Sequence, residues 1–513
     1  MVHERSRVYR YPTLLRAHRS FLLFALVLLA LVIAPAAVSA QDAATPVVLG
    51  TPASDRPVPG APGIGDPYYP LLGNGGYDVA HYTIDLDLDV EDGRILDATT
   101  TIDAVATQDL SAFNLDFRGP DIDGITVNGE PAAWTRAGGE LTVTPAATLN
   151  AGEQFQAEVA YHGTPEVDED DRFERGWWAT GNSIFAIGEP AGSDVWYPVN
   201  GHPLDKATYT MIVTVPEPYD VVANGIPTSV ARSTGAAVNP STATFTWENQ
   251  EPTASYLVMF HAADLDVSIT DDSSGITLIE AFPPDLPEQE LVIFDRVPEM
   301  VEVFEELFGP YPFASLGNTV FEDTSFNAAL ETQGMIGYDA SAVSERTIAH
   351  EVAHQWFGNS VSPVRWQDIW LNEGFARYSE VLWAEAAHGP NAAATALQRQ
   401  VSSFATASRT PTGEGVLISD PGAGHLFTEV PYAGGAVVLH ELRQRFGDET
   451  FFSLLREWAT RYRHSNATTA NFIALAEEVS GEDLDAFFTD WLYTPWTPER
   501  VADHFPLPGT PVS

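Results

Sequence analysis

Short segments in which apolar and polar residues alternate recur from Tyr77 to about Ile269. In Tyr82–Val90, for example, Tyr, Ile, Leu, Leu and Val alternate with Thr and Asp. A period of two is typical of strands with one buried face. The aspartates could suggest a calcium loop, but their alternation with aliphatic residues favours the solvent face of a strand. We therefore predict a β-rich, mostly antiparallel N-terminal domain over residues 77–272.

The pattern changes after about residue 275, where apolar residues recur at the three- and four-residue spacing of amphipathic helices. The predicted helices are Val297–Leu307, Val343–Phe357, Glu373–Ala387, Gly435–Phe446, Glu449–Tyr462, Thr469–Ser480 and Leu484–Leu492. We assign residues 273–496 to a second, helix-containing domain and residues 497–513 to a Pro-containing tail. The fold class predicted from these patterns is a multidomain α+β protein.

The N-terminus has the order of an export signal. Several arginines precede an apolar run, Phe21–Ala34, and small residues follow up to Ala40. We predict a signal peptide over residues 1–40, cleaved after Ala40, and hence an extracellular or cell-envelope location. The run is short for a membrane span, and an uncleaved anchor is the alternative. Residues 41–76, rich in Pro, Gly and Ala, are predicted to form a linker or an extended arm.

Composition limits the chemistry and the partners. The 513 residues include no cysteine, so thiolate chemistry and Cys-based zinc sites are excluded, and a metal must be bound by His and carboxylates. The formal net charge of −46 disfavours nucleic acids and anionic membranes as partners. We expect no nucleic-acid binding and no stable membrane association after signal removal. The oligomeric state stays open.

The most informative motif is the segment His350-Glu351-Val352-Ala353-His354. On a helix, positions i and i+4 share a face, so both imidazoles can reach one ion and Glu351 can approach a water on it. Glu373, on a following helix, would complete three protein ligands and leave a fourth position open, as in catalytic zinc sites. The five-residue motif alone is only moderately specific, since an amphipathic helix with hydrogen-bonded histidines could also carry it. We predict one Zn²⁺ per chain, with Glu351 as general base.

Further motifs lie before and after this one along the chain. They are Trp196-Tyr197-Pro198, His202–Ala207, Phe308–Phe313, Trp370–Ala376 and Tyr432–Ala436. With the zinc motif, they make roughly residues 77 to 495 resemble the aminopeptidase N family of gluzincin metallopeptidases, which includes leukotriene hydrolase. The resemblance implies a saddle-like β domain followed by a thermolysin-like α/β domain, with the cleft between them. It also implies a zinc-dependent peptide hydrolase, most readily an aminopeptidase acting on peptide substrates.

The resemblance assigns roles to single residues. His350, His354 and Glu373 match the zinc ligands, Glu351 the general base and Tyr432 the tyrosine that stabilises the oxyanion. The alternative for Tyr432 is a packed aromatic residue at the start of a helix. Glu380, seven positions after Glu373, would lie on the same side of its helix, where it could support a ligand or be a surface charge.

The element that recognises a free amine departs from the family pattern. Family members carry Gly-x-Met-Glu-Asn, whereas this chain has Ala328-Ala329-Leu330-Glu331-Thr332. We predict substrate binding by Glu331 and by the backbone of Ala328 and Ala329. The family's amine-anchoring Gln corresponds to Ile187, whose side chain cannot accept a hydrogen bond from an ammonium group. A weakened preference for free amino termini is therefore expected.

Two other functions stay open. One is an endopeptidase or a hydrolase of non-peptide substrates, and the other is a non-catalytic binding protein on the same fold. The long helical C-terminal domain of larger family members has no counterpart here, which predicts a more open site or closure by self-association.

Overall fold

The computed structural model describes residues 56–165, 176–233, 241–271, 275–321, 326–409 and 413–505. The predicted signal peptide and residues 41–55 of the predicted linker lie outside these ranges. The chain from Pro57 onward forms one compact unit. Among the described residues, no helix combines the length and apolarity that crossing a bilayer requires.

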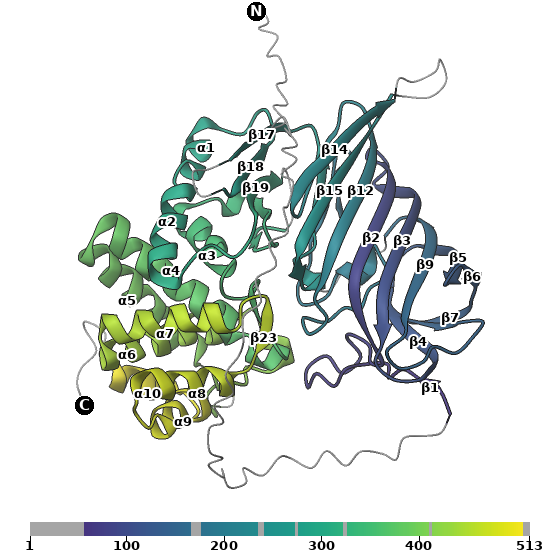
Figure 1. The fold of residues 1–513 in the computed structure, drawn as a ribbon. Coiled ribbons are helices and arrows are strands. Elements are labelled where there is room, and N and C mark those ends of the chain that lie inside the picture. Colours follow the sequence, from purple (N-terminus) through teal and green to yellow (C-terminus); the bar gives the residue numbers. More distant parts are fainter. Residues whose placement is uncertain are drawn as a thin grey trace, which may run out of the picture. The chain divides into compact units, whose positions relative to one another are not determined.

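A twisted eight-stranded sheet dominates the first half of the described chain (Figure 1). Its strands, in spatial order, are β14 (Ile226–Ser233), β15 (Thr242–Thr253), β12 (Ala207–Pro216), β2 (Tyr77–Asp89), β3 (Arg94–Ala106), β9 (Gln154–Gly163), β5 (Asp121–Val127) and β6 (Glu130–Pro131). Only β2 and β12 pair in parallel, so the predicted mostly antiparallel arrangement is confirmed. In β2, Ile84, Leu86 and Leu88 are fully buried whereas Asp85 and Asp87 are exposed, which confirms the strand interpretation.

Two four-stranded sheets accompany the large one. The first contains β1 (Val58–Pro59), β4 (Leu110–Asp116), β8 (Glu140–Thr144) and β7 (Ala133–Ala137). The second contains β10 (Trp178–Ala179), β11 (Ser183–Ala186), β16 (Phe260–Ala263) and β13 (Asp220–Ala223). Inward-facing aliphatic and aromatic residues of these sheets form one continuous core, because alternate side chains of each strand point to the same face.

The described part of the predicted linker is an arm that packs on the rest of the protein. Val58 and Pro59 pair with β4, and Asp66 is buried. Asp66 accepts hydrogen bonds from the backbone N–H groups of Tyr68 and Trp366 and lies 3.1 Å from Nε2 of His202. The arm therefore connects the β-rich part of the chain to the loop that follows the zinc motif.

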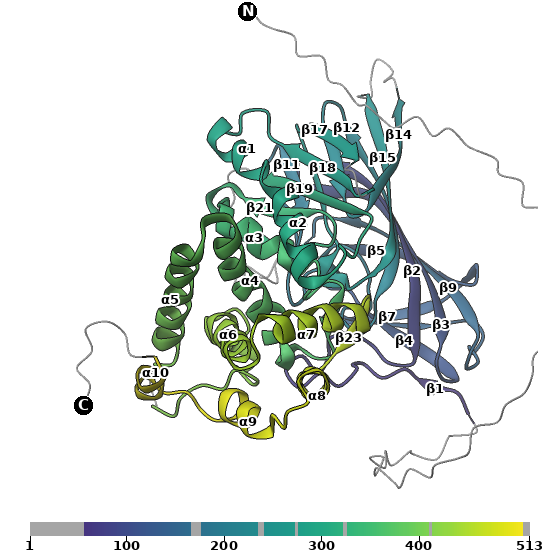
Figure 2. The ribbon, with the colours of Figure 1, turned by 60° about the vertical axis from the view of Figure 1, so that its left-hand side comes forward.

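A five-stranded mixed sheet leads into the helical part. Its order is β17 (Asp266–Asp271), β18 (Thr277–Phe282), β19 (Ser315–Phe321), β21 (Ile336–Asp339) and β20 (Ala329–Leu330). β17 pairs with β18, so this sheet crosses the predicted domain boundary at residue 272, and the boundary itself stays a prediction. β20 is an edge strand that pairs only with β21 among the described strands, and it contacts the helix α3 (Glu345–His354), which is labelled just below β21 in Figure 2.

Ten α-helices complete the described chain, and a short parallel pair, β22 (Val361–Pro363) and β23 (Ser465–Ala467), lies among them. The helices are α1 (Glu288–Phe294), α2 (Val297–Phe308), α3 (Glu345–His354), α4 (Trp370–His388), α5 (Pro390–Ala407), α6 (Gly435–Phe446), α7 (Asp448–Arg461), α8 (Thr469–Ser480), α9 (Asp485–Tyr493) and α10 (Pro498–His504). The predicted α+β class is confirmed.

Three differences from the predicted helices matter. α4 begins three residues earlier than predicted, so Glu373 lies within its first turn. α5 was not predicted, because its alanine-rich sequence has few large apolar residues to mark a buried face. The predicted C-terminal tail contains α10, whose Val501 is buried.

Candidate active site

The residues of the zinc motif lie at the end of α3. Ser344 caps the helix by accepting a hydrogen bond from the backbone N–H of Thr347, and His354 is its last residue. The Nε2 atoms of His350 and His354 are 3.1 Å apart, and Oε2 of Glu373, from α4, lies 3.4 Å from each. The structure thus brings the three predicted metal ligands together at one point.

The orientation of both imidazoles is set through their Nδ1 atoms. Nδ1 of His350 lies 3.1 Å from Oε1 of Glu380, and Nδ1 of His354 lies 3.0 Å from the carbonyl oxygen of Phe357. Both neighbouring oxygens are hydrogen-bond acceptors, so each Nδ1 carries a hydrogen and donates a hydrogen bond. The lone pair of each Nε2 is therefore left to bind a cation. Glu380 is nearly fully buried, so of its two predicted roles the structure favours support of a ligand.

This donor set fits a zinc ion. Within the described residues, Oε2 of Glu373 has no hydrogen-bond partner, although it is buried. Ligands about 2.0–2.2 Å from a tetrahedral zinc ion lie about 3.2–3.6 Å from one another, which is close to the spacing of these three atoms. Two imidazole nitrogens and one carboxylate oxygen are also ligand types that zinc prefers.

The charges around the site favour a cation. Burial alone would lower the pKa of His354, but the carboxylates of Glu331 and Glu373 outweigh burial and raise this pKa to about 10. Burial opposes ionisation of Glu373 as well, yet His354 and His350 hold its pKa at about 2. A metal ion competes with a proton for the same nitrogen lone pairs, so a site that attracts protons this strongly also attracts a divalent cation.

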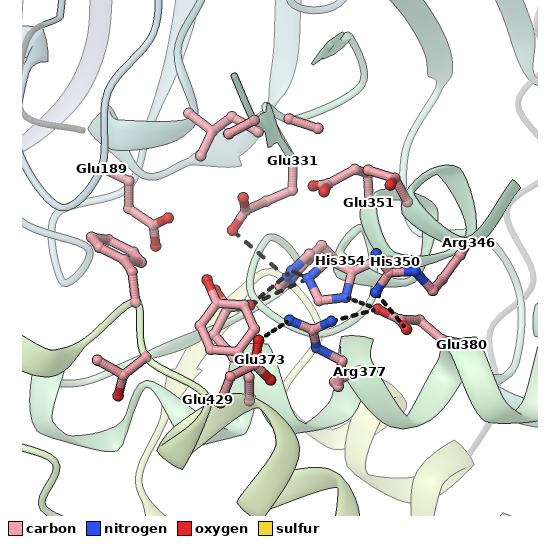
Figure 3. A pocket seen from close by; sticks show the side chains of 17 residues that line it. Glu189, Glu331, Arg346, His350, Glu351, His354, Glu373, Arg377, Glu380 and Glu429 are labelled. Atoms are coloured by element: carbon pink, nitrogen blue, oxygen red, sulfur yellow. Dashed lines mark hydrogen bonds and ion pairs between the residues drawn. The ribbon is translucent and has the colours of Figure 1, made fainter. Parts of the chain in front are cut away.

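A cavity of about 220 Å³ opens over the three ligand atoms (Figure 3). Its lining includes every residue predicted from the sequence: the metal ligands His350, His354 and Glu373, with Glu351, Tyr432, Ala328, Ala329 and Glu331. These residues come from α3, α4, the edge of the five-stranded sheet and the turn before α6. The structure therefore gathers the whole predicted set around one cavity.

Glu351 and Tyr432 lie on the walls of the cavity. Burial raises the pKa of the Glu351 carboxyl to about 7, with the two histidines acting against it, and a general base works best near this value. Tyr432 belongs to η6 (Val430–Gly434), a single turn of π-helix before α6, a conformation frequent at functional sites. Its ring is parallel to the His350 imidazole, with ring centroids 6.0 Å apart and 4° between the planes.

The sequence reasoning missed Glu189. Ile187, taken as the position of the amine anchor, is buried in the core and does not line the cavity, whereas Glu189, two residues later, does. The Glu189 side chain is buried, and its Oε1 has no hydrogen-bond partner within the described residues. The available signal was a carboxylate residue, Glu189, only two positions after Ile187.

Glu189 extends a cluster of carboxylates. Oxygen atoms of Glu189, Glu331 and Glu373 all lie within 4.8 Å of one another. Oε1 of Glu331 is also buried without a hydrogen-bond partner in the part of the chain described, although Nδ1 of His354 lies 3.8 Å away. Burial, and then the charge of Glu331, hold the pKa of Glu189 well above its usual range. The raised pKa means that this buried carboxyl favours its neutral form when no cation lies beside it, and a bound cation would favour the ionised form.

Comparisons with known proteins agree with this geometry. The model of the peptidase family M1 domain matches residues 293–491. Human glutamyl aminopeptidase is 27% identical over 59% of this chain and 33% of its own length, and the tricorn protease-interacting factor F2 of Thermoplasma acidophilum is 23% identical over 76% and 50%. The chain thus spans about a third to a half of the length of these curated relatives.

A solved structure covers more of the chain. The M1 zinc metallopeptidase from Deinococcus radiodurans, in a mutant form bound to a Tyr-Ser-Ala substrate, is 28% identical and superposes with a TM-score of 0.75 over 84% of this chain and 97% of that one. The shared arrangement is that of a two-domain M1 zinc metallopeptidase. The match of residues 293–491 to the family M1 domain, together with these relatives, confirms the resemblance to the aminopeptidase N family and the fold that it implied.

Proposed function

We propose that this chain is a zinc-dependent aminopeptidase that releases N-terminal residues from peptides. The observation that carries the proposal is the group of buried carboxylates, Glu189, Glu331 and Glu373, with three oxygens lacking hydrogen-bond partners within the described residues. A buried carboxylate without a partner is costly, and a protonated α-amine supplies both the positive charge and up to three N–H donors. The amino terminus of a peptide would therefore bind beside the metal site.

The relatives support this proposal. Human glutamyl aminopeptidase and the probable aminopeptidase 2 of Sulfurisphaera tokodaii are named for this activity. Mutant forms of M1 zinc metallopeptidases have been solved with a Tyr-Ser-Ala substrate, with L-tryptophan and with L-arginine. Each of these ligands carries a free α-amine.

His350, His354 and Glu373 would hold one zinc ion per chain. When bound, zinc polarises a carbonyl group and lowers the pKa of a water molecule that it binds. Glu351 accepts the proton of the attacking water and passes it to the leaving amine, for which its raised pKa is suited. The Tyr432 hydroxyl donates a hydrogen bond to the oxygen on which negative charge develops.

The edge strand β20 would align the substrate. β20 (Ala329–Leu330) has a pairing partner on only one side among the described strands, and Ala328, Ala329 and Leu330 line the cavity. A free strand edge can pair with an extended peptide through backbone hydrogen bonds. Such pairing would hold the first peptide bond between Glu351 and the carboxylate corner, which is formed by Glu189, Glu331 and Glu373.

The test compares amino-acid amides with their N-acetylated forms, each with and without a chelator. Free amines should be hydrolysed in a chelator-sensitive way. Acetylated forms should not, because they leave Glu189 and Glu331 buried without a cation. Equal turnover of the two forms would overturn the proposal and favour an endopeptidase, whereas no turnover by zinc-loaded protein would favour a binding protein.

We also propose that the protein is exported. The support is the order of basic residues, apolar run and small residues up to Ala40. Expression in a secreting bacterial host followed by N-terminal sequencing should give a mature protein that begins at Gln41. Retention of residues 1–40 in a membrane fraction would favour the uncleaved anchor.

A further inference from the structure

Arg377 lies in the wall of the cavity, one helical turn after the metal ligand Glu373. Its guanidinium carbon is 5.1 Å from the centre of the Tyr432 ring. Its Nη1 is 3.4 Å from Oε1 of Glu380, and its Nη2 is 3.3 Å from Oε1 of Glu429 (Figure 3). Only 14% of this side chain is exposed, so its position is set by these contacts rather than by solvent.

The two carboxylates lead to different parts of the site. Oε1 of Glu380 also accepts the hydrogen bond from Nδ1 of His350. Glu429 immediately precedes η6. Its carbonyl oxygen accepts hydrogen bonds from the backbone N–H groups of Ala433 and Gly434, which follow Tyr432. One guanidinium group therefore connects the residue that orients a metal ligand to the turn that carries the tyrosine.

The aromatic ring of Tyr432 neighbours the His350 imidazole and the Arg377 guanidinium group. It lies parallel to the His350 imidazole, and the guanidinium carbon of Arg377 is 5.1 Å from the ring centre. A cation near an aromatic face is attracted by the negative charge of that face and restrains the ring. The ring direction sets where the hydroxyl points, and a misplacement of about 1 Å can lower a catalysed rate about 10²-fold.

Arg346 provides a comparison within the same cavity. Its Nη1 lies 3.4 Å from Oε2 of Glu380, so Glu380 keeps one cationic partner without Arg377. Glu429 would lose its guanidinium partner, and Tyr432 would lose the cation near its ring. Removing Arg377 should therefore disturb the tyrosine more than the metal ligand.

We propose that Arg377 is a positioning residue for Tyr432, which it restrains through contact with the ring and through Glu429 in the adjoining turn. This inference rests on the proposed function, in which the Tyr432 hydroxyl stabilises the developing oxyanion. The ion-pair partners of Arg377 are Glu380 and Glu429 rather than the three metal ligands, so we expect its effect on the reaction to pass through the tyrosine.

The test is a double-mutant cycle in the zinc-loaded protein. Arg377→Met should lower kcat about 10- to 100-fold, with KM changed less than about threefold and zinc content unchanged. In the Tyr432→Phe background, the same substitution should cause almost no further loss, because the hydroxyl that it positions is absent. Arg377→Lys, which keeps a cation, should recover part of the rate. An equal loss in both backgrounds, or a loss of zinc, would overturn the proposal.

Arg346→Met is the matched control. It removes an arginine of the same cavity that also pairs with Glu380, but the contacts of Arg346 do not include the Tyr432 ring. Whatever its effect on kcat, that effect should be the same with Tyr432 and with Phe at that position. Coupling as strong as that of Arg377 would show a general effect of cavity charge and would overturn the assignment to Arg377.

A second readout does not depend on activity. Crystal structures of the wild type and of Arg377→Met should show the Tyr432 ring turned out of its parallel arrangement with His350 in the variant only. An unchanged ring would refute the positioning role even in an inactive protein. If the wild type hydrolysed no peptide, the proposed function would fail while these structures still decided the role of Arg377. Should Arg377→Met not fold, the same measurements can be made on Glu429→Gln, which weakens the ion pair between Glu429 and Arg377.

Discussion

The metal corner of the cavity (His350, His354 and Glu373) and the carboxylate corner (Glu189, Glu331 and Glu373) share Glu373 but differ in how their other members are held. In the metal corner, each imidazole is oriented by a hydrogen bond from Nδ1, and three ligand atoms already converge. In the carboxylate corner, Glu189 and Glu331 each bury an oxygen without a hydrogen-bond partner among the described residues. In the proposed function, the first corner is preorganised for a resident ion, whereas the second is completed by the substrate. Changes in the first should therefore abolish the chemistry, and changes in the second should alter which molecules are accepted.

Metal removal should have the largest effect. Dialysis against a chelator should reduce hydrolysis of a free amino-acid amide to background, and zinc should restore it. The melting temperature should also fall, because an ion that binds only the folded state stabilises that state. Amide assays, metal analysis and thermal unfolding measure the three effects. Full activity in protein shown to be metal-free would contradict the role of the metal corner.

Glu351→Gln should come next, with kcat about 10² to 10⁴ times lower, because Gln cannot accept the proton of the attacking water. Zinc content should stay the same, since Glu351 is not one of the three converging ligands. The chelator should also lower the melting temperature of this variant as much as that of the wild type. Turnover close to that of the wild type would remove Glu351 from the role of base.

Glu189→Gln and Glu331→Gln should act on substrate choice. Each removes a charged partner of the α-amine and should lower kcat/KM for a free-amine substrate about 10- to 100-fold, mostly through KM. Ile187→Val is the matched control, because Ile187 lies two residues from Glu189 but in the core, so KM should not change. An unchanged KM in both Glu variants would mean that the corner does not bind the amine.

Glu380→Gln should have the smallest effect of the four. It weakens the hydrogen bond that orients His350 and should lower zinc affinity about tenfold, as measured by competition with a chelator. The preference for free over acetylated substrates should remain, because Glu380 is not part of the carboxylate corner. A change in that preference would show that the two corners are not independent.

Local spacing accounts for most of what could be predicted about the site. The four-residue separation of His350 and His354 places both on one face of any helix, whatever the rest of the fold. Alternation in β2 likewise predicted a strand with a buried aliphatic face. Glu380 shows the limit of this reasoning. Helical periodicity placed it on the side of Glu373, but only its burial, its contact with His350 and its ion pair with Arg346 favour support of a ligand over a surface charge.

The contacts that spacing could not predict join distant segments. Glu189 follows β11, Glu331 follows the edge strand β20, and Arg377 contacts Glu429 across more than fifty residues of chain. No sequence periodicity relates these positions. Even two neighbouring positions differ, since Ile187 lies in the core whereas Glu189, two residues later, lines the cavity.

By itself, the sequence determined the two kinds of secondary structure, the zinc motif with its base and the family that these motifs resemble, because each depends on short-range periodicity or on motifs in a fixed order. Only the tertiary structure decided which carboxylates share a corner and which arginine contacts the tyrosine. Those relations arise from packing between a sheet edge, two helices and a turn, where burial and charge are properties of the assembled cavity and of no single segment.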